Sequence, residues 1–278
     1  MPRMTHPHSA LDAIGLLPDS EIDVADAALH LARVDAPEAD WRAARAHLSD
    51  IAREAVRAAA GISADDLPAQ AEALATLLAG RHGYRGDSET YENLDNANLI
   101  RVIERRRGLP VALGILWLHA ARAAGFAAHG IDFPGHFLVG LDGARRQIVL
   151  DVFSGGKALD AKDLRPLLKR VEGPNAELRP GILVPMGARA VLLRLQNNIK
   201  LRRLRAPDLA AALACAETML RIAPEEAPLW REAALLHQRL DQVSAALRCY
   251  ERFLDLVPQG DAATRARAAM EELRSRLN

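Results

Sequence analysis

Apolar residues recur every three or four positions along the first part of the chain, which is the spacing that places them on one face of an α-helix. Val24, Ala28 and Leu31 follow this spacing, and Trp41 and Leu48 repeat it further on. Alanine, a strong helix former, is frequent between them. The pattern predicts a helical N-terminal segment, which we place at residues 1–80.

A different pattern covers LPVALGILWLHAARAAG, residues 109–125, which is apolar almost all round. Pro110 suits the first turn of a helix, and Gly125 suits the position that follows a helix C-terminus. A helix without a polar face is surrounded by protein. The segment is therefore predicted to be a buried helix rather than a surface helix.

Alternation with period two marks residues 133–153, FPGHFLVGLDGARRQIVLDVF, as two strands around a turn. One face of this hairpin is apolar, and the other carries His136 and Asp151. A four-residue loop at 142–145 places these two residues directly opposite each other, whereas a two-residue turn at 142–143 makes them diagonal neighbours. Both registers keep them on one face, and helices combined with this hairpin predict an α+β fold.

The last hundred residues contain an internal repeat. Residues Ala212–Pro224 align with Ala246–Pro258 at a shift of 34 positions, with six identities in thirteen positions. A period of 34 is the spacing of tetratricopeptide (TPR) helix pairs. Cys215 and Cys249 occupy equivalent places in the two copies and are interpreted as small packing residues. The sequence thus predicts a TPR-like C-terminal region beyond the turn-rich stretch at 173–180.

Composition and charge narrow the classes of partner. Half of the 278 residues are apolar, and 36 basic residues balance 36 acidic ones. Without a net charge there is no global field that attracts nucleic acid or anionic lipid, so neither nucleic acid nor a membrane is expected as a partner. The N-terminus is too acidic for a signal peptide, and two cysteines imply no disulfide framework. We expect a cytoplasmic protein.

The hairpin supplies the candidate chemistry. A histidine beside an aspartate is two thirds of a catalytic triad, in which the carboxylate orients the imidazole. The nucleophile of such a triad belongs at the N-terminus of a buried helix, where the helix dipole stabilises a thiolate. No Cys, Ser or Thr occurs from Tyr91 to Phe153, and Ser88, Thr90 and Ser154 only flank this window. The expected nucleophile is absent.

The segments GLPVALGILWLHAARAAG, PGHFLVG and IVLDVFSGG resemble the core of the transglutaminase-like superfamily, and more specifically the bacterial SirB-type proteins. This resemblance implies a papain-like core, placed at residues 81–176, followed by a TPR-like helical region at 177–278. His136 and Asp151 match the histidine and aspartate of the family. The position of the family's cysteine falls near Pro110. The asparagine-serine that usually precedes the core reads Asn96-Ala97 here.

Three functional hypotheses follow from these observations. The leading one is a non-catalytic interaction protein whose cleft and TPR-like helices recognise a protein or peptide. The binding residues predicted for it are Asn96, Asn98, Pro134 and Gly135, beside a vestigial pair of His136 and Asp151. The alternative is a hydrolase or acyltransferase in which His136 acts as general base on water and Asp151 orients it. The third is a structural scaffold without a ligand in the cleft.

No metal or cofactor is expected. His129, Asp132 and His136 have a spacing that metal ligands can show, but Pro134 and Gly135 interrupt any regular geometry between them. A turn at these two residues that aims His136 is the preferred interpretation.

Overall fold

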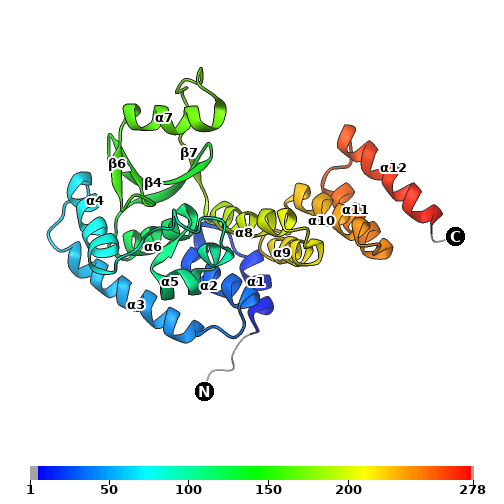
Figure 1. Ribbon diagram of the computed structural model, residues 1–278, viewed down its shortest axis with the longest axis horizontal. Helices are drawn as coiled ribbons and strands as arrows, with labels where there is room; N and C mark the ends of the chain where they lie inside the picture. Colours follow the sequence, from blue (N-terminus) through cyan, green and yellow to red (C-terminus); the bar gives the residue numbers. More distant parts are fainter. Residues whose placement is uncertain (1–5, 277–278) are drawn as a thin grey trace. The chain divides into compact units, whose positions relative to one another are not determined.

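The chain divides into two compact units in the computed structural model, which describes residues 6–276. One unit, here called the core unit, is Pro18–Leu195. The other, here called the helical unit, combines the N-terminal residues up to Leu17 with the residues from Gln196 onward. Helices dominate the helical unit, and the core unit mixes helices with a sheet (Figure 1). The predicted α+β class is confirmed.

The helices that open the core unit are α2 (Val24–Asp35), α3 (Trp41–Ala58) and α4 (Leu67–Ala75), the last running into a π-helical turn at Thr76–Arg81. Each begins after an aspartate whose carboxylate accepts hydrogen bonds from backbone N–H groups of the first turn. These capping residues are Asp23, Asp40 and Asp66. The helical pattern of the first eighty residues is thus confirmed, and capping side chains set the helix limits.

The central helix α6 (Pro110–Ala123) begins at the proline and ends next to Gly125, as the sequence predicts. The positions that face the sheet and those that face the N-terminal helices are both buried. A Cβ added at Gly114 lies 2.1 Å from Cε1 of Phe137, so only glycine lets this strand residue pack against the helix. Among residues 6–276, no helix combines the length and the hydropathy needed to cross a membrane.

A five-stranded antiparallel sheet lies beside α6, in the order β6-β5-β4-β3-β7. Helices α6 and α7 (Ala161–Glu172) lie on opposite sides of it (Figure 1). On the α7 side, Leu138 and Val149 pack with Leu164 and Leu168. The face of the hairpin that carries His136 and Asp151 is therefore covered by α7 and buried over most of its length. The strand bounds are β3 (Ala128–Phe133), β4 (His136–Asp142), β5 (Gln147–Asp151), β6 (Lys157–Leu159) and β7 (Val184–Met186).

The hairpin register differs from both predicted alternatives. Val139 pairs with Leu150 and Asp142 pairs with Gln147, so the loop spans residues 143–146. Asp142 stays in the strand because its carboxylate holds His129 and Gln147, while its N–H donates to the carbonyl of Ala127. His136 and Asp151 are consequently diagonal neighbours on one face.

The limits of the units differ from the predicted segments 1–80, 81–176 and 177–278. Residues 18–80 belong to the core unit, and so do β7 and the first half of α8 (Ala188–Arg205). The prediction that the protein is helical throughout after residue 180 is wrong at β7, which pairs with β3. Three residues, Val-Pro-Met, are too short to show a strand periodicity, so only the pairing reveals them.

In the helical unit, the repeat appears as two helix pairs. The first pair is α9 (Leu209–Ile222) with α10 (Ala227–Arg239), and the second is α11 (Val243–Leu256) with α12 (Asp261–Ser275). Each helix of the second pair begins 34 residues after its counterpart. The N-terminal helix α1 (Pro7–Gly15) packs on α9, where Asp12 forms an ion pair with Arg221.

From their positions in the repeat, four residues are predicted to fill the space between the paired helices: Trp230, Leu247, Tyr250 and Leu254. Only Tyr250 is fully buried, and the other three are partly exposed. The interior is filled instead by smaller residues and by Phe253, so the prediction is wrong for three of the four. The Trp230 indole N–H donates to the carbonyl of Pro224, a 2.8 Å bond at the end of α9.

Candidate functional site

A cavity of about 560 Å³ lies where β4 begins and β5 ends, and it is here called the cleft. Its walls come from the loop after β1 (Arg85–Gly86), the N-terminus of α6, the turn between β3 and β4, the segment after β5, and α7. The lining residues are Ser88, Tyr91, Pro110, Pro134, Gly135, His136, Asp151, Phe153, Ser154, Leu167, Arg170 and Val171.

The centre of the cleft is the pair of His136 and Asp151. Nε2 of His136 lies 2.9 Å from Oδ1 of Asp151. The Asp151 carboxylate also accepts hydrogen bonds from the Ser154 hydroxyl at 2.7 Å and from the N–H of Phe153 at 3.1 Å. Burial by itself raises the pKa of Asp151, but the bonds from His136 and Ser154 outweigh it and hold this pKa below its ordinary value. Asp151 is therefore a fixed carboxylate that orients the imidazole.

The other ring nitrogen of His136, Nδ1, has no hydrogen-bond partner within residues 6–276. The His136 side chain is 17 % exposed and lines the cleft. An imidazole bound to a carboxylate through one nitrogen and open at the other can accept a proton from a group in the cleft or hydrogen-bond to it.

The backbone around His136 is fixed by the Pro134-Gly135 turn. Gly135 has a φ of +68°, and a Cβ there would lie 2.3 Å from Cγ2 of Val171 on α7. On the strand side, the guanidinium of Arg194 donates to the carbonyl of His136 at 2.8 Å. The turn thus positions His136 and also ties β4 to α7.

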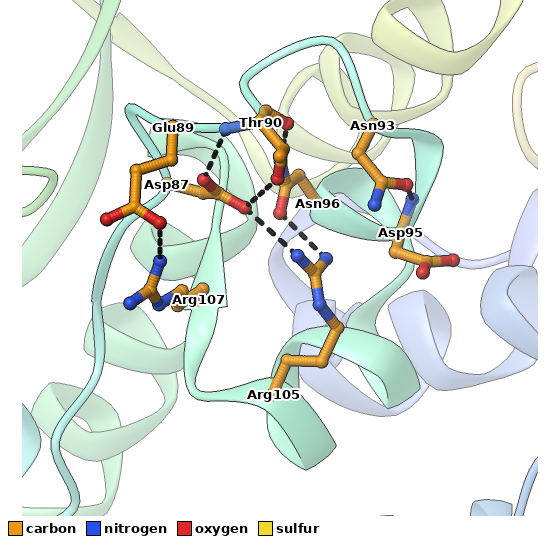
Figure 2. A network of polar contacts seen from close by, with 8 residues as sticks. All are labelled: Asp87, Glu89, Thr90, Asn93, Asp95, Asn96, Arg105 and Arg107. Carbon is orange, nitrogen blue, oxygen red and sulfur yellow. Dashed lines mark hydrogen bonds and ion pairs between the residues drawn. The ribbon is translucent and has the colours of Figure 1, made fainter.

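A buried polar network holds the loop wall of the cleft (Figure 2). The carboxylate of Asp87, 1 % exposed, accepts hydrogen bonds from the N–H and the hydroxyl of Thr90 at 2.8 and 2.7 Å, and from Arg105 at 3.0 Å. Figure 2 shows Arg105 reaching from α5 (Leu99–Arg105) to both Asp87 and Asn96. Burial raises the pKa of Asp87, but these bonds overcome it and lower the pKa to about 2. The network closes the loop that carries Ser88 and Tyr91 to the cleft.

Asn96 and Asn98, the two predicted binding residues that precede the core helix, do not line the cleft. Asn96 is completely buried, donates to the carbonyl of Thr90 and accepts from Arg105. Asn98 caps α5 and donates to the carbonyl of Ala32. Their amides are used inside the protein, because each satisfies buried backbone groups. Pro134, Gly135, His136 and Asp151 are brought together in the cleft.

Residues 42–197 match the family model of the transglutaminase-like superfamily, and residues 199–271 match a tetratricopeptide repeat model. A UPF0162 protein of Xylella fastidiosa is 31% identical over 194 residues, which cover 69% of this chain and 69% of that protein. Another from Vibrio cholerae is 29% identical over 243 residues, covering 87% and 89%. Protein SirB1 of Salmonella typhimurium is 24% identical over 204 residues, covering 73% and 76%. The chain belongs to the SirB-type transglutaminase-like family.

In this SirB-type core, the resemblance places the family's nucleophile near Pro110, and that placement stays a prediction. Pro110 is the first residue of α6 and lines the same cleft as His136 and Asp151. Both cysteines lie in the helical unit, and both are buried. The Cys215 thiol donates to the side chain of Gln196, and burial raises the pKa of Cys249 to about 11. Neither thiol lines the cleft.

Sequence reasoning missed two hydroxyls and one wall of the SirB-type cleft. Ser88 and Ser154 only flank the core window in the sequence, yet both line the cleft. Leu167, Arg170 and Val171 reach it from α7, which follows the hairpin. The spacing of Asp87 and Thr90 was the available signal for the loop, because an aspartate followed three residues later by a hydroxyl residue favours a side-chain-stabilised turn.

The three residues considered as metal ligands have separate partners. His129 pairs with Asp142, Asp132 pairs with Arg194, and His136 pairs with Asp151. In the part of the chain that the structure describes, no group of three His, Cys, Asp or Glu side chains is arranged to hold a metal ion.

The TPR region carries a second candidate surface, a groove of about 870 Å³ within the helical unit. Helices α1, α9, α10 and α11 line it. Its lining includes the apolar residues Trp230 and Leu220 and side chains of both charges. Arg221 forms an ion pair with Asp12, and Arg252 forms one with Glu225. TPR regions in general mediate contacts between proteins.

Proposed function

We propose that this protein is a non-catalytic member of its family that uses the cleft and the TPR region to recognise a protein or peptide. One observation carries the proposal: an oriented pair of His136 and Asp151 lines the cleft together with Pro110, the first residue of α6, near which the family resemblance places the nucleophile. His136, held by Asp151, can still hydrogen-bond to a ligand. Covalent catalysis as in the catalytic transglutaminases needs a cysteine nucleophile, and neither cysteine lines the cleft.

The rim of the cleft supports recognition over a purely structural role. Tyr91 on the loop wall is 39 % exposed, and Val171 on α7 is 55 % exposed. Large apolar side chains that gather around a cavity and remain exposed mark ligand or partner sites, because covering them removes apolar area from water. A purely structural role of His136 and Asp151 would not explain why apolar side chains remain exposed around the cavity.

The cytoplasm is the compartment that we propose for this activity. Cys215 and Cys249 are both free and buried, and they do not form a disulfide. Unpaired buried thiols are typical of proteins kept in a reducing environment.

Affinity capture from native extract tests the proposal. Ser88→Trp places an indole in the cleft, and Ser49→Trp adds the same indole on the exposed face of α3 as a matched control. We expect a partner captured by the wild type to be lost with Ser88→Trp and with His136→Ala, and kept with Ser49→Trp. An unchanged set of captured proteins in all three variants contradicts recognition by the cleft and favours a structural role.

The alternative function is hydrolysis or acyl transfer with His136 as general base on a water molecule. It is favoured by one feature, the unpartnered Nδ1 of His136 beside a carboxylate that holds the ring. Hydrolysis of p-nitrophenyl acetate and transamidation of a glutamine peptide are the assays. An activity that disappears in His136→Ala, and that persists when Cys215 and Cys249 are replaced by alanine, establishes this alternative in place of a non-catalytic cleft.

A further inference from the structure

The free charge of the cleft comes from a single residue of α7, Arg170. Two ionised side chains line the cleft, Asp151 and Arg170. The Asp151 carboxylate is occupied by His136, Ser154 and the N–H of Phe153. Arg170 is exposed and forms no ion pair or side-chain hydrogen bond within residues 6–276. The cleft therefore offers an uncompensated positive charge and no available negative one.

Two other basic residues of the same helix share an acidic partner. Arg165 and Lys169 both lie within 4 Å of Glu177, at 3.9 and 3.8 Å. Arg170 instead lines a cavity whose other walls are apolar or carry hydroxyl groups, apart from the mutually bonded pair of His136 and Asp151. A cation that lines a concave site without a counterion is available to a ligand with negative charge.

We propose that the cleft binds a peptide carboxylate, and that the guanidinium of Arg170 is its ion-pair partner. This inference rests on the recognition function proposed above. Guanidinium and carboxylate are both planar and form two parallel hydrogen bonds, so one arginine matches one carboxylate. The Ser88 hydroxyl lines the same cavity and can donate to a carboxylate oxygen. Nδ1 of His136, the acceptor nitrogen of a ring whose Nε2–H is bonded to Asp151, can accept from a peptide N–H.

The size and walls of the cleft favour a peptide with an apolar side chain next to the carboxylate. The volume of about 560 Å³ lies in the range of small-ligand pockets and accommodates a short stretch of extended peptide. Tyr91, Phe153, Leu167 and Val171 provide apolar surface around Arg170. The carboxylate can come from the C-terminus of a polypeptide or from an Asp or Glu side chain, and both present the same chemistry to Arg170.

Titration of the full-length protein with three peptides tests the inference and separates the two sources. The probes are acetyl-Leu-Ala-Leu with a free C-terminal acid, the same peptide as its amide, and acetyl-Leu-Glu-Leu amide. Binding is followed by backbone amide chemical shifts of Gly135 and Phe153, which line the cleft. We expect at least one carboxylate peptide to bind about tenfold more tightly than the uncharged amide.

Two charge-neutralising variants on the same helix complete the test. Arg170→Gln removes the charge in the cleft, and Arg165→Gln removes one outside it. We expect the preference for the acid to vanish in Arg170→Gln and to remain in Arg165→Gln, with both variants as thermally stable as the wild type. Equal affinities for acid and amide, an unchanged preference in Arg170→Gln, or no shift at the cleft amides overturns the inference.

Different results would contradict recognition by the cleft and the preference for a carboxylate. If Ser88→Trp abolishes capture of a partner while acid and amide peptides bind the cleft equally, recognition holds and the carboxylate preference is wrong. If capture is unchanged by Ser88→Trp, recognition itself is wrong, whatever the peptides do.

Discussion

Two histidine–aspartate pairs lie on the same sheet, and only one of them has the properties of a site. In the first, Nε2 of His136 contacts Asp151 at 2.9 Å and Nδ1 is left open to the cleft. In the second, Nδ1 of His129 contacts Asp142 at 2.7 Å, and Nε2 is occupied by the amide of Gln147 at 3.1 Å.

The carboxylates differ as much as the rings. The side chain of Asp151 is 10 % exposed and receives three hydrogen bonds, whereas that of Asp142 is 43 % exposed. An exposed ion pair contributes little to stability, whereas a buried carboxylate with fixed donors is both oriented and costly to disturb. A contact between histidine and aspartate does not define a site. The first pair differs from the second in two features, the burial of its carboxylate and the open nitrogen of its imidazole.

The largest expected effect that separates the pairs is on stability. Asp151→Ala leaves the Ser154 hydroxyl, the N–H of Phe153 and the imidazole without their shared acceptor, so we expect a loss of about 3 kcal/mol in the free energy of unfolding. Asp142→Ala is the matched control and is expected to cost less than about 1 kcal/mol. Urea denaturation in a Trp230→Phe background reports on the core unit through Trp41 and Trp117. Equal costs for the two variants refute the distinction.

Asp87 is a third carboxylate to compare, and its contribution to stability is expected to depend on pH. Its folded-state pKa of about 2 lies below the ordinary value for an aspartate, so its contribution to stability is present above about pH 4 and is lost as the pH falls through about 2. Because the neighbouring residues of its loop are exposed, solvent screening reduces this contribution to about 1 to 2 kcal/mol. The stability difference between the wild type and Asp87→Asn, measured at about pH 6 and about pH 2.5, is expected to shrink at the lower pH. A constant difference contradicts an ionised, bonded Asp87.

Energetic coupling within each pair is the next largest effect. A double-mutant cycle of His136→Ala and Asp151→Asn is expected to give a coupling of about 1 kcal/mol, because both groups are largely removed from water. The equivalent cycle of His129→Ala and Asp142→Asn is expected to give less than about 0.5 kcal/mol. Strict additivity of the first cycle means that His136 and Asp151 do not interact in solution.

The smallest effect concerns the nitrogen that Gln147 occupies. Gln147→Ala is an exposed substitution and is expected to change stability by less than about 0.5 kcal/mol, but it frees Nε2 of His129. Modification by diethyl pyrocarbonate, located by mass spectrometry, is therefore expected to proceed faster at His136 than at His129 in the wild type. The rates are expected to converge in Gln147→Ala. A His129 that already reacts as fast as His136 in the wild type removes the difference between the rings.

Local patterns in the sequence were sufficient for the elements whose signals are local. Pro110 and Gly125 mark the two ends of α6 because proline suits a first helical turn and glycine suits the residue after the last one. The shift of 34 residues predicted the helix pairs of the TPR region, since repeated units fold in the same way. Period-two alternation put His136 and Asp151 on one face of a hairpin, and that placement holds in any even register shift.

The sequence could not supply what depends on contacts between distant segments. The observed hairpin register keeps Asp142 in the strand, where its partner His129 comes from another strand. Strand β7 exists only because it pairs with β3, and α1 belongs to the helical unit only because it packs on α9. Such pairings leave no periodic pattern within a short segment of sequence. They are therefore seen only in the folded structure.

The candidate site likewise has some properties that are local in the sequence and others that depend on distant segments. The sequence by itself determined which side chains are available: a histidine and an aspartate on one face of the hairpin, and no Cys, Ser or Thr at the start of the buried helix. Tertiary structure decided the shape and charge of the cleft, because it took Asn96 and Asn98 into the interior and brought Ser88 and Arg170 to the cavity from segments outside the hairpin. A residue's type is written in the sequence, but its surroundings are made by residues that are distant in sequence and are adjacent only in the folded state.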